Sequence, residues 1–252
     1  IIYKGMHLGL KMPVAIKMMR HDLAMDPDFL RNFRNEAETI ASLNHENIIK
    51  FYNIEERFQT VFLIMEYIEG ESLIKMLKRL KAIPPKLAVH FLIQICSGLQ
   101  YTHGRGIIHR DINSSNILIQ RDDQLKVLDF GLACPIGTED FSSLGTRGYM
   151  APEQIQGDPM DQRTDIYAVG ITAYEMLVGH KPFSGNDPHV LEDMHLSHDI
   201  PDPAASVPNL LPDLQRFVIK SCQRDPHLRY DNFKLALADL QRIAVQQGGN
   251  PG

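Results

Sequence analysis

Cysteine is scarce in this chain, and the few that occur form no pattern. Cys96, Cys134 and Cys222 are the three cysteines among 252 residues, and none of them belongs to a C-x-x-C pair. Their number and spacing argue against a disulfide framework and against a zinc site. A reducing compartment fits best, so we expect a cytoplasmic chain, or the cytoplasmic domain of a larger or membrane-anchored protein.

Long apolar runs and basic clusters are also lacking. No run approaches the roughly 18 apolar residues of a membrane span, and the first residues lack the layout of a signal peptide. The net charge is −5 and the basic residues are scattered, whereas a nucleic-acid-binding domain gathers them on one face. We expect no nucleic-acid partner and no membrane contact by this segment.

The first part of the chain has the residue pattern of strands. Residues 13–19 and 61–67 are β-branched runs, each predicting a strand. Between them, Asp26 followed by Pro27 signals the start of a helix. Its apolar residues recur at helical spacing at Phe29, Phe33, Ile40 and Leu43.

The pattern changes at Glu69 and Gly70 and becomes mainly helical. Apolar residues then recur at three- and four-residue intervals over residues 86–101, 163–178, 211–222 and 231–245. We therefore expect an α+β chain with a small β-rich domain at 1–68, a larger helical domain at 69–245 and a linker-like tail at 246–252. Ligands commonly bind in the cleft between two such domains.

Two charged residues of the first domain are placed where charges are unusual. Lys17 shares its strand face with the small Ala15. Glu36 falls on the apolar stripe of the predicted helix, where an inward carboxylate needs a partner. A pair of the two would direct the lysine amine toward phosphate oxygens. A glutamate that reaches solvent is the alternative.

The segment 107–119, IIHRDINSSNILI, combines two short apolar strands with a polar loop. Asp111 in this loop is either a cap or a carboxylate that accepts a hydroxyl proton. Asn116 offers an uncharged oxygen to a hard cation, and Asp129, at the end of a later apolar strand, is the expected direct ligand. Together Asn116 and Asp129 would suffice for a nucleotide-bound Mg²⁺.

These motifs occur in a familiar order. VAIK, the helix glutamate, HRD with an asparagine five positions beyond the aspartate, DFG, and APE at 151–153 follow the protein-kinase signature set. The chain resembles the catalytic domain of eukaryotic-like Ser/Thr protein kinases of the bacterial type, over residues 1 to about 245. The resemblance implies a bilobal kinase fold that transfers the γ-phosphate of ATP to Ser/Thr hydroxyls of protein substrates, with Mg²⁺ as cofactor.

The resemblance also implies a role for each matching residue. Lys17 would hold the α- and β-phosphates and pair with Glu36, and Asp111 would accept the substrate's proton. Asn116 and Asp129 would bind Mg²⁺. The residues that would surround the nucleotide are Ala15, Lys17, Met65, Glu66, Ile68, Leu118 and Asp129.

Other matches are expected to be structural or regulatory. Asp165 resembles the buried acid that braces the HRD backbone, and Arg229 resembles the partner of Glu153. Arg110 beside the catalytic aspartate implies activation by a phosphate. The candidate acceptors are Thr138, Ser142 and Ser143, and the internal stack of the family would comprise Ile40, Phe51, His109 and Phe130.

Two features depart from the family pattern. No G-x-G-x-x-G occurs in the chain, which we interpret as a truncated N-terminal lobe, a degenerate domain being the alternative. Asn113 stands where Ser/Thr kinases usually carry a lysine that neutralises the γ-phosphate, which predicts slower turnover and weakens the choice of Ser/Thr over Tyr. Thr146 supports Ser/Thr.

Three functions remain open from the sequence. The first is a protein kinase, for which a second copy would be a partner for autophosphorylation. The second is a pseudokinase that binds partners or nucleotide without efficient catalysis. The third, a small-molecule phosphotransferase, is disfavoured because Asp165, Arg229 and APE resemble the peptide-binding apparatus of protein kinases.

Overall fold

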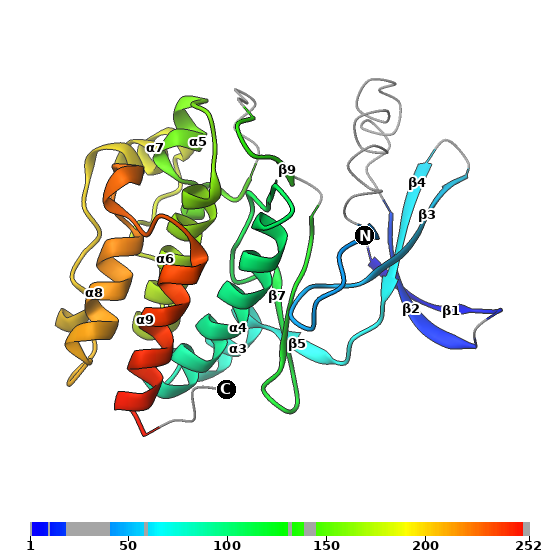
Figure 1. The fold of residues 1–252 in the computed structure, drawn as a ribbon, viewed down its shortest axis with the longest axis horizontal. Coiled ribbons are helices and arrows are strands. Elements are labelled where there is room, and N and C mark those ends of the chain that lie inside the picture. Colours follow the sequence, from blue (N-terminus) through cyan, green and yellow to red (C-terminus); the bar gives the residue numbers. More distant parts are fainter. Residues whose placement is uncertain are drawn as a thin grey trace. The chain divides into compact units, whose positions relative to one another are not determined.

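The computed structural model describes residues 2–9, 11–18, 41–57, 60–130, 133–138 and 145–248. The chain divides into two compact units, Ile1–Gly70 and Glu71–Gly252 (Figure 1). Strands dominate the described part of the first unit and helices dominate the second. This distribution confirms the predicted α+β class.

The first unit contains a four-stranded antiparallel sheet in the order β1-β2-β4-β3. Its strands are β1 (Ile2–His7), β2 (Met12–Met18), β3 (Phe51–Arg57) and β4 (Thr60–Glu66). The predicted runs are therefore confirmed as strands over residues 13–18 and 61–66; residue 19 lies outside the described residues, and residue 67 follows the end of β4. Val14 is buried in β2, whereas Ala15 and Lys17 on the opposite face are half-buried.

Most of the helix predicted between these strands lies outside the described residues. Asp26, Pro27, Phe29, Phe33 and Ile40 all belong to that part of the chain. Glu36 lies there as well, so its pairing with Lys17 stays a prediction. Leu43, the last apolar position of the pattern, is described and is buried.

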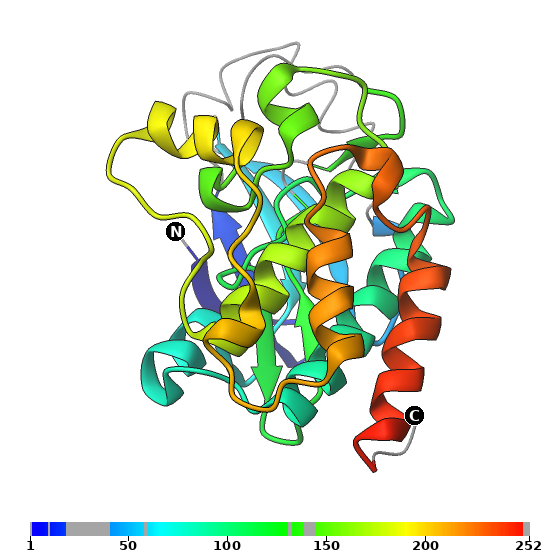
Figure 2. The same cartoon turned by 90° about the vertical axis from the view of Figure 1, so that its left-hand side faces the viewer.

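The second unit is built on long helices. The periodic segments of the sequence form α4 (Pro85–His103), α6 (Gln162–Val178), α8 (Pro212–Ser221) and α9 (Phe233–Gln246). Helix α4 packs on α6 and α9, and α8 packs on the same two helices (Figure 2). Shorter helices complete the unit, namely α3 (Leu73–Leu80), α5 (Pro152–Gln156) and α7 (Pro188–Ser197).

Short strands and turns connect these helices. One sheet has the order β5-β7-β8, and a two-stranded sheet pairs β6 with β9. The strands are β5 (Gly70–Ser72), β6 (Ile107–Ile108), β7 (Ile117–Gln120), β8 (Leu125–Val127) and β9 (Cys134–Pro135). The 3-10 turns are η1 (Arg147–Tyr149), η2 (Pro203–Ala205) and η3 (Pro226–Leu228).

Helix α6 is the buried centre of the second unit. Every residue from Thr164 to Leu177 is buried. The Asp161 side chain caps its first turn by accepting from the Arg163 amide, and Gly179 ends it at a φ of 90°, where glycine carries no steric penalty. None of the described helices is long and apolar enough to cross a bilayer.

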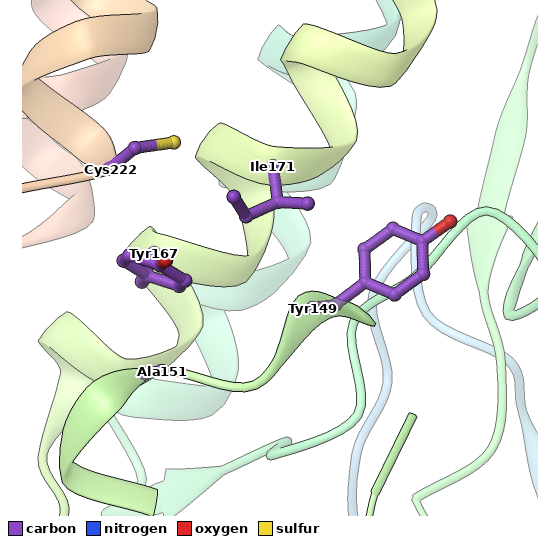
Figure 3. Packing of buried hydrophobic residues seen from close by; sticks show 5 residues of the cluster. All are labelled: Tyr149, Ala151, Tyr167, Ile171 and Cys222. Atoms are coloured by element: carbon purple, nitrogen blue, oxygen red, sulfur yellow. The ribbon is translucent and has the colours of Figure 1, made fainter. Parts of the chain in front are cut away.

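One apolar cluster fixes the segment that precedes α5 onto α6. Tyr149 and Ala151 pack with Tyr167 and Ile171 of α6 and with Cys222 at the end of α8 (Figure 3). All five side chains are buried, so removing any of them leaves a cavity in a close-packed region. The cluster therefore holds η1 against α6.

Candidate active site

The loop between β6 and β7 places Asp111 at the centre of a hydrogen-bond network. One carboxylate oxygen, Oδ1, accepts from the backbone amide of Thr146 at 2.9 Å. The other, Oδ2, accepts from the side-chain amide of Asn116 at 2.9 Å. Asp111 is half-buried. Its carboxylate is thus fixed in orientation by two donors and remains accessible to a hydroxyl group.

Asn116 has the geometry expected of a cation ligand. Its Nδ2 donates both to the backbone oxygen and to the carboxylate of Asp111, each at 2.9 Å. These two bonds use both amide protons and leave Oδ1 as the oxygen available to a cation. The Leu128 amide donates to the Asn116 carbonyl at 2.8 Å, which brings Asp129 next to Asn116. This donor set fits Mg²⁺.

Magnesium needs few protein ligands because substrate phosphates and water complete its shell. The described residues contain no group of three or more His, Cys, Asp or Glu side chains that could hold a metal ion by themselves. An asparagine oxygen with one carboxylate is therefore an arrangement suited to a metal that arrives with a nucleotide, not to a closed structural site.

The backbone at this site adopts an uncommon conformation at two positions. Arg110 has a φ of 69° and Asp129 a φ of 59°, both in the left-handed region that side chains other than glycine disfavour. Such residues cost of the order of 1–3 kcal/mol each and persist only where their surroundings hold them. Asp165 supplies that restraint at Arg110.

Asp165 on α6 braces the loop that carries Asp111, as predicted. Its carboxylate accepts from the backbone amides of His109 at 2.8 Å and Arg110 at 2.9 Å, and from His103 Nε2 at 2.7 Å. Burial alone would raise the pKa of Asp165, but the hydrogen bond and charge of His103 lower it below the usual value. The buried carboxylate therefore stays ionised and holds the loop.

His109 is a structural histidine, in agreement with its interpretation from the sequence. It is fully buried and its Nε2 donates to the Leu128 carbonyl at 2.7 Å. Its ring lies 4.6 Å from the ring of Phe130, centroid to centroid. Of the predicted internal stack, Ile40 lies outside the described residues, and the pairing of His109 with Phe130 is confirmed.

Asn113, the residue that replaces the expected lysine, is folded into the loop. It is 2% exposed. Its Nδ2 donates to the Asp111 carbonyl at 3.0 Å and to the Thr146 hydroxyl at 3.1 Å, and its Oδ1 accepts from the Ser115 amide at 2.9 Å. The side chain thus connects the Asp111 loop to Thr146.

A second link between the same segments was not expected from the sequence. Ser114 of the loop lies 2.9 Å, oxygen to oxygen, from the Tyr149 hydroxyl, which donates to Glu175 on α6 at 2.5 Å. Burial raises the pKa of Tyr149, and the Glu175 carboxylate raises it further. No spacing rule relates these three residues, because each comes from a different element.

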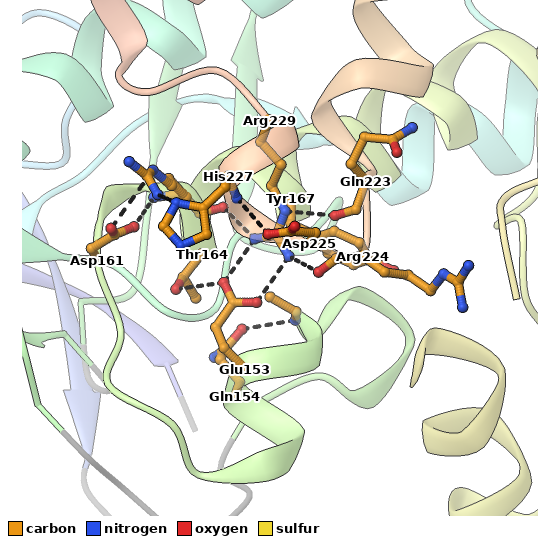
Figure 4. Close-up of polar contacts among 12 residues, drawn as sticks. Glu153, Gln154, Asp161, Thr164, Tyr167, Gln223, Arg224, Asp225, His227 and Arg229 are labelled. Carbon is orange, nitrogen blue, oxygen red and sulfur yellow. Dashed lines mark hydrogen bonds and ion pairs between the residues drawn. The ribbon is translucent and has the colours of Figure 1, made fainter. Parts of the chain in front are cut away.

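The predicted ion pair between Glu153 and Arg229 is present and buried. The guanidinium donates to both carboxylate oxygens, at 2.7 and 2.9 Å (Figure 4). Thr164 of α6 also donates to Glu153, at 2.9 Å. Three backbone carbonyls accept the remaining Arg229 donors, at Arg163, Gln223 and Arg224.

The predicted nucleotide-contacting residues of the first unit lie on β2, on β4 and just after β4. Ala15 is the register partner of Met65, which is buried, and Lys17 is the partner of Leu63. The next two members of the set, Glu66 at the end of β4 and Ile68 after it, are half-buried. In the second unit, Leu118 is half-buried on β7, on the face opposite Ile117 and Ile119.

Comparison with known proteins decides which family this arrangement belongs to. The sequence profile of the protein kinase domain matches residues 1–238. The chain belongs to the protein kinase family. The recognition made from the signature motifs and the expected kinase fold are therefore correct.

The similar curated proteins are bacterial serine/threonine-protein kinases. The chain is 35% identical to PknB of Mycobacterium tuberculosis, over 96% of this chain and 40% of that protein. It is 34% identical to PknB of Mycolicibacterium smegmatis, over 99% of this chain and 41% of that protein. It is 35% identical to PknL of Mycobacterium tuberculosis, over 97% of this chain and 62% of that protein.

The chain thus spans less than two thirds of the length of each of these relatives. Membership of the family implies ATP as a substrate, a divalent metal ion as cofactor and proteins as acceptors. The bonds around Asp111, Asn116 and Asp165 fit this chemistry because they orient a proton acceptor beside oxygen ligands for a metal.

Proposed function

We propose that this kinase domain transfers the γ-phosphoryl group of ATP to Ser or Thr hydroxyls of protein substrates. The observation that carries the proposal is the fixed carboxylate of Asp111, held by Thr146 and Asn116 and still accessible. In the transfer, the hydroxyl oxygen forms a bond to the γ-phosphorus, the bond to the β-phosphate oxygen breaks, and Asp111 accepts the hydroxyl proton.

The proposed metal ligands are Asn116 and Asp129. When bound, Mg²⁺ neutralises charge on the phosphate oxygens. The protein's own contribution is orientation: the Asp111 contacts turn Asn116 Oδ1 outward, and the Leu128 bond fixes Asp129 beside it. This arrangement supports magnesium over softer metals, which prefer sulfur or imidazole ligands.

The remaining site residues are proposed on family likeness. Lys17 would bind the α- and β-phosphates and pair with Glu36. The residues proposed to contact the rest of the nucleotide are Ala15, Met65, Glu66, Ile68 and Leu118. We also propose residues 1–68 and 69–245 as the two kinase lobes, with 246–252 as the tail after them.

Asn113 bears on the rate of this reaction. It is neutral and its polar atoms are engaged within the protein, so position 113 supplies no cation to the γ-phosphate. Preorganised charge is among the largest contributions to phosphoryl transfer. We therefore expect a slow kinase. If phosphate transfer is absent, Asn113 in place of the lysine would instead favour a binding scaffold without efficient catalysis.

Transfer of labelled phosphate from Mg-ATP to a generic protein substrate tests the proposal. Wild-type chain should label the substrate, whereas Lys17→Met and Asp111→Asn should lose most of the activity. Asp122→Asn is a matched control, because Asp122 is an exposed aspartate whose carboxylate accepts from the nearby Gln124 amide. Labelling no greater than that of Asp111→Asn, with binding of a fluorescent nucleotide retained, would instead establish the scaffold.

Phosphorylation of the kinase itself remains a prediction. Thr138 is described, and its carbonyl accepts from the Met160 amide at 3.2 Å, while Ser142 and Ser143 lie outside the described residues. A second copy of the chain is the proposed partner for this autophosphorylation. Phosphopeptide mapping of active protein that found all three unmodified would refute it. Localisation in the cytoplasm also remains a prediction.

A further inference from the structure

The side chain of Lys181 places a positive charge beside the turn η1. Lys181 follows the end of α6, is half-buried, and has its Nζ 5.3 Å from the centroid of the Tyr149 ring. Among the residues that the structure describes, no carboxylate forms an ion pair with it. A partly desolvated ammonium without a counter-ion favours the binding of an anion.

The ammonium lies against the turn that contacts the catalytic aspartate. A Cβ atom added to Gly148 would come within 2.5 Å of Lys181 Nζ, so the absence of a side chain at Gly148 leaves the lysine its position. Two residues earlier, the Thr146 amide donates to Asp111. A peptide whose hydroxyl reaches Asp111 extends by about 3.3 Å per residue in either direction, so a residue within about four positions of the acceptor can reach this turn.

The nearby carboxylates are already engaged with other groups. Glu175 accepts from the Tyr149 hydroxyl at 2.5 Å and is buried. Glu192 forms an ion pair with Arg147 at 2.7 Å. The charge of Glu192 is thus compensated by Arg147, whereas Glu175, whose partner is a neutral hydroxyl, keeps its negative charge at the hydroxyl end of the Tyr149 ring.

The charge of Lys181 also affects the pKa of His195. His195 on α7 is fully buried. Burial lowers its pKa to about 4, and the charge of Lys181 adds to that effect. His195 therefore stays neutral near pH 7 and adds no second cation beside Lys181.

We propose that Lys181 is a substrate-specificity residue that binds an acidic side chain, Asp or Glu, close to the acceptor hydroxyl of the protein substrate. The inference rests on the proposed kinase function, because it assigns the turn to the substrate. A carboxylate at this place would accept a charge-assisted hydrogen bond from the ammonium, and an arginine or lysine there would be repelled. The preferred substrates are therefore acidic near the acceptor.

Peptide binding tests the proposal independently of catalysis. A fluorescent serine peptide is prepared with one glutamate scanned over about four positions on each side of the serine, a span of about 13 Å each way, and each glutamate peptide is matched by a glutamine peptide. Fluorescence anisotropy gives the affinity ratio of each pair for the wild-type chain. Exposed or half-exposed charge pairs correspond to a preference of about 1.5- to 5-fold for glutamate at one or two positions.

Three variants and one control locate the effect. Lys181→Gln removes the charge and should abolish the preference, whereas Lys181→Arg should retain it. Gly148→Ala keeps the charge but displaces the ammonium, and should reduce the preference. Lys220→Gln is the matched control, because Lys220 also lies over a tyrosine ring, 4.1 Å from the centroid of Tyr230, on α8. It should bind as the wild type does.

Equal affinity of wild type for every glutamate and glutamine pair would overturn the proposal. A preference that survives Lys181→Gln would do so as well. Phosphate transfer to the same peptides is measured in parallel, so the two proposals can fail separately: a glutamate preference in binding without any transfer would refute the kinase reaction and leave the assignment of Lys181 standing.

Discussion

The side-chain amide of Asn113 donates a hydrogen bond to the hydroxyl of Thr146 at 3.1 Å. This contact joins the loop that carries Asp111, the proposed catalytic aspartate, to the turn that borders the proposed substrate site. A neutral hydrogen bond contributes about 1 kcal/mol net, which corresponds to a rate change of about fivefold where it orients a reacting group. The replacement of the expected lysine therefore has a structural function of its own.

Asn113→Ala should lower kcat for phosphate transfer about 10-fold or more, because it removes the Thr146 contact and two further hydrogen bonds within the loop. Thr146→Val should lower kcat less, since its backbone amide still donates to Asp111. In the Thr146→Val background, Asn113→Ala should cost less than it does alone. Thr146→Ser, which keeps the hydroxyl, is the control. Effects that multiply independently would show that the contact contributes nothing to turnover.

Asp165→Asn should destabilise the second unit. An asparagine offers one acceptor oxygen where the aspartate accepts from two backbone amides and from His103, so at least one buried donor loses its partner. The expected loss is about 3 kcal/mol of unfolding free energy, measured by urea denaturation. Asp231→Asn is the comparison, since this residue is exposed and forms a surface pair with Arg163. Equal effects of the two variants would contradict the bracing function of Asp165.

The sequence predicted those features that local patterns encode. Helix α6 and helix α9 were evident from apolar periodicity, and Asp165 and Arg229 from their place in known motifs. Periodicity indicates which residues face a core, and a family motif predicts both a residue and the group that it contacts. These predictions agree with the structure to within two residues at the helix ends.

Contacts between distant elements that belong to no motif could not be predicted from the sequence. The two hydrogen bonds that connect Ser114, Tyr149 and Glu175 form because three elements meet in space. The same is true of Lys181, which only the fold places against Gly148. The sequence predicted that Asn113 removes a positive charge. It did not predict that the side chain is hydrogen-bonded within the loop, because an asparagine side chain can point into the protein or toward solvent.

The effects on stability of mutating Glu153 and Arg229 should be coupled. The Arg229 side chain is 0% exposed, so Glu153→Gln or Arg229→Met leaves a charge buried without its partner, at a cost of about 3–5 kcal/mol. The double variant should lose clearly less than the sum of the two. Arg224→Gln, which breaks an exposed pair with Asp199, should cost no more than about 1 kcal/mol. Additive single and double effects in urea denaturation would contradict the coupling.

His195 should make the stability of the protein fall in mild acid. Its pKa is lowered to about 4 in the folded chain, mainly by burial, whereas the unfolded chain binds the proton near pH 6.5. As the pH falls below about 6.5, the unfolded state gains a proton that the folded state does not, so stability decreases down to about pH 4. Across that range the loss from this residue is of the order of 3 kcal/mol.

Unfolding free energies measured in urea at several pH values between about 4 and 7.5 test this titration. His195→Gln should flatten the dependence on pH, because glutamine does not titrate. His198→Gln should leave the dependence unchanged, since His198 is exposed just beyond the end of the same helix, α7. A wild-type slope that persists in His195→Gln would assign the acid sensitivity to another group. The same slope in all three proteins would therefore refute the prediction.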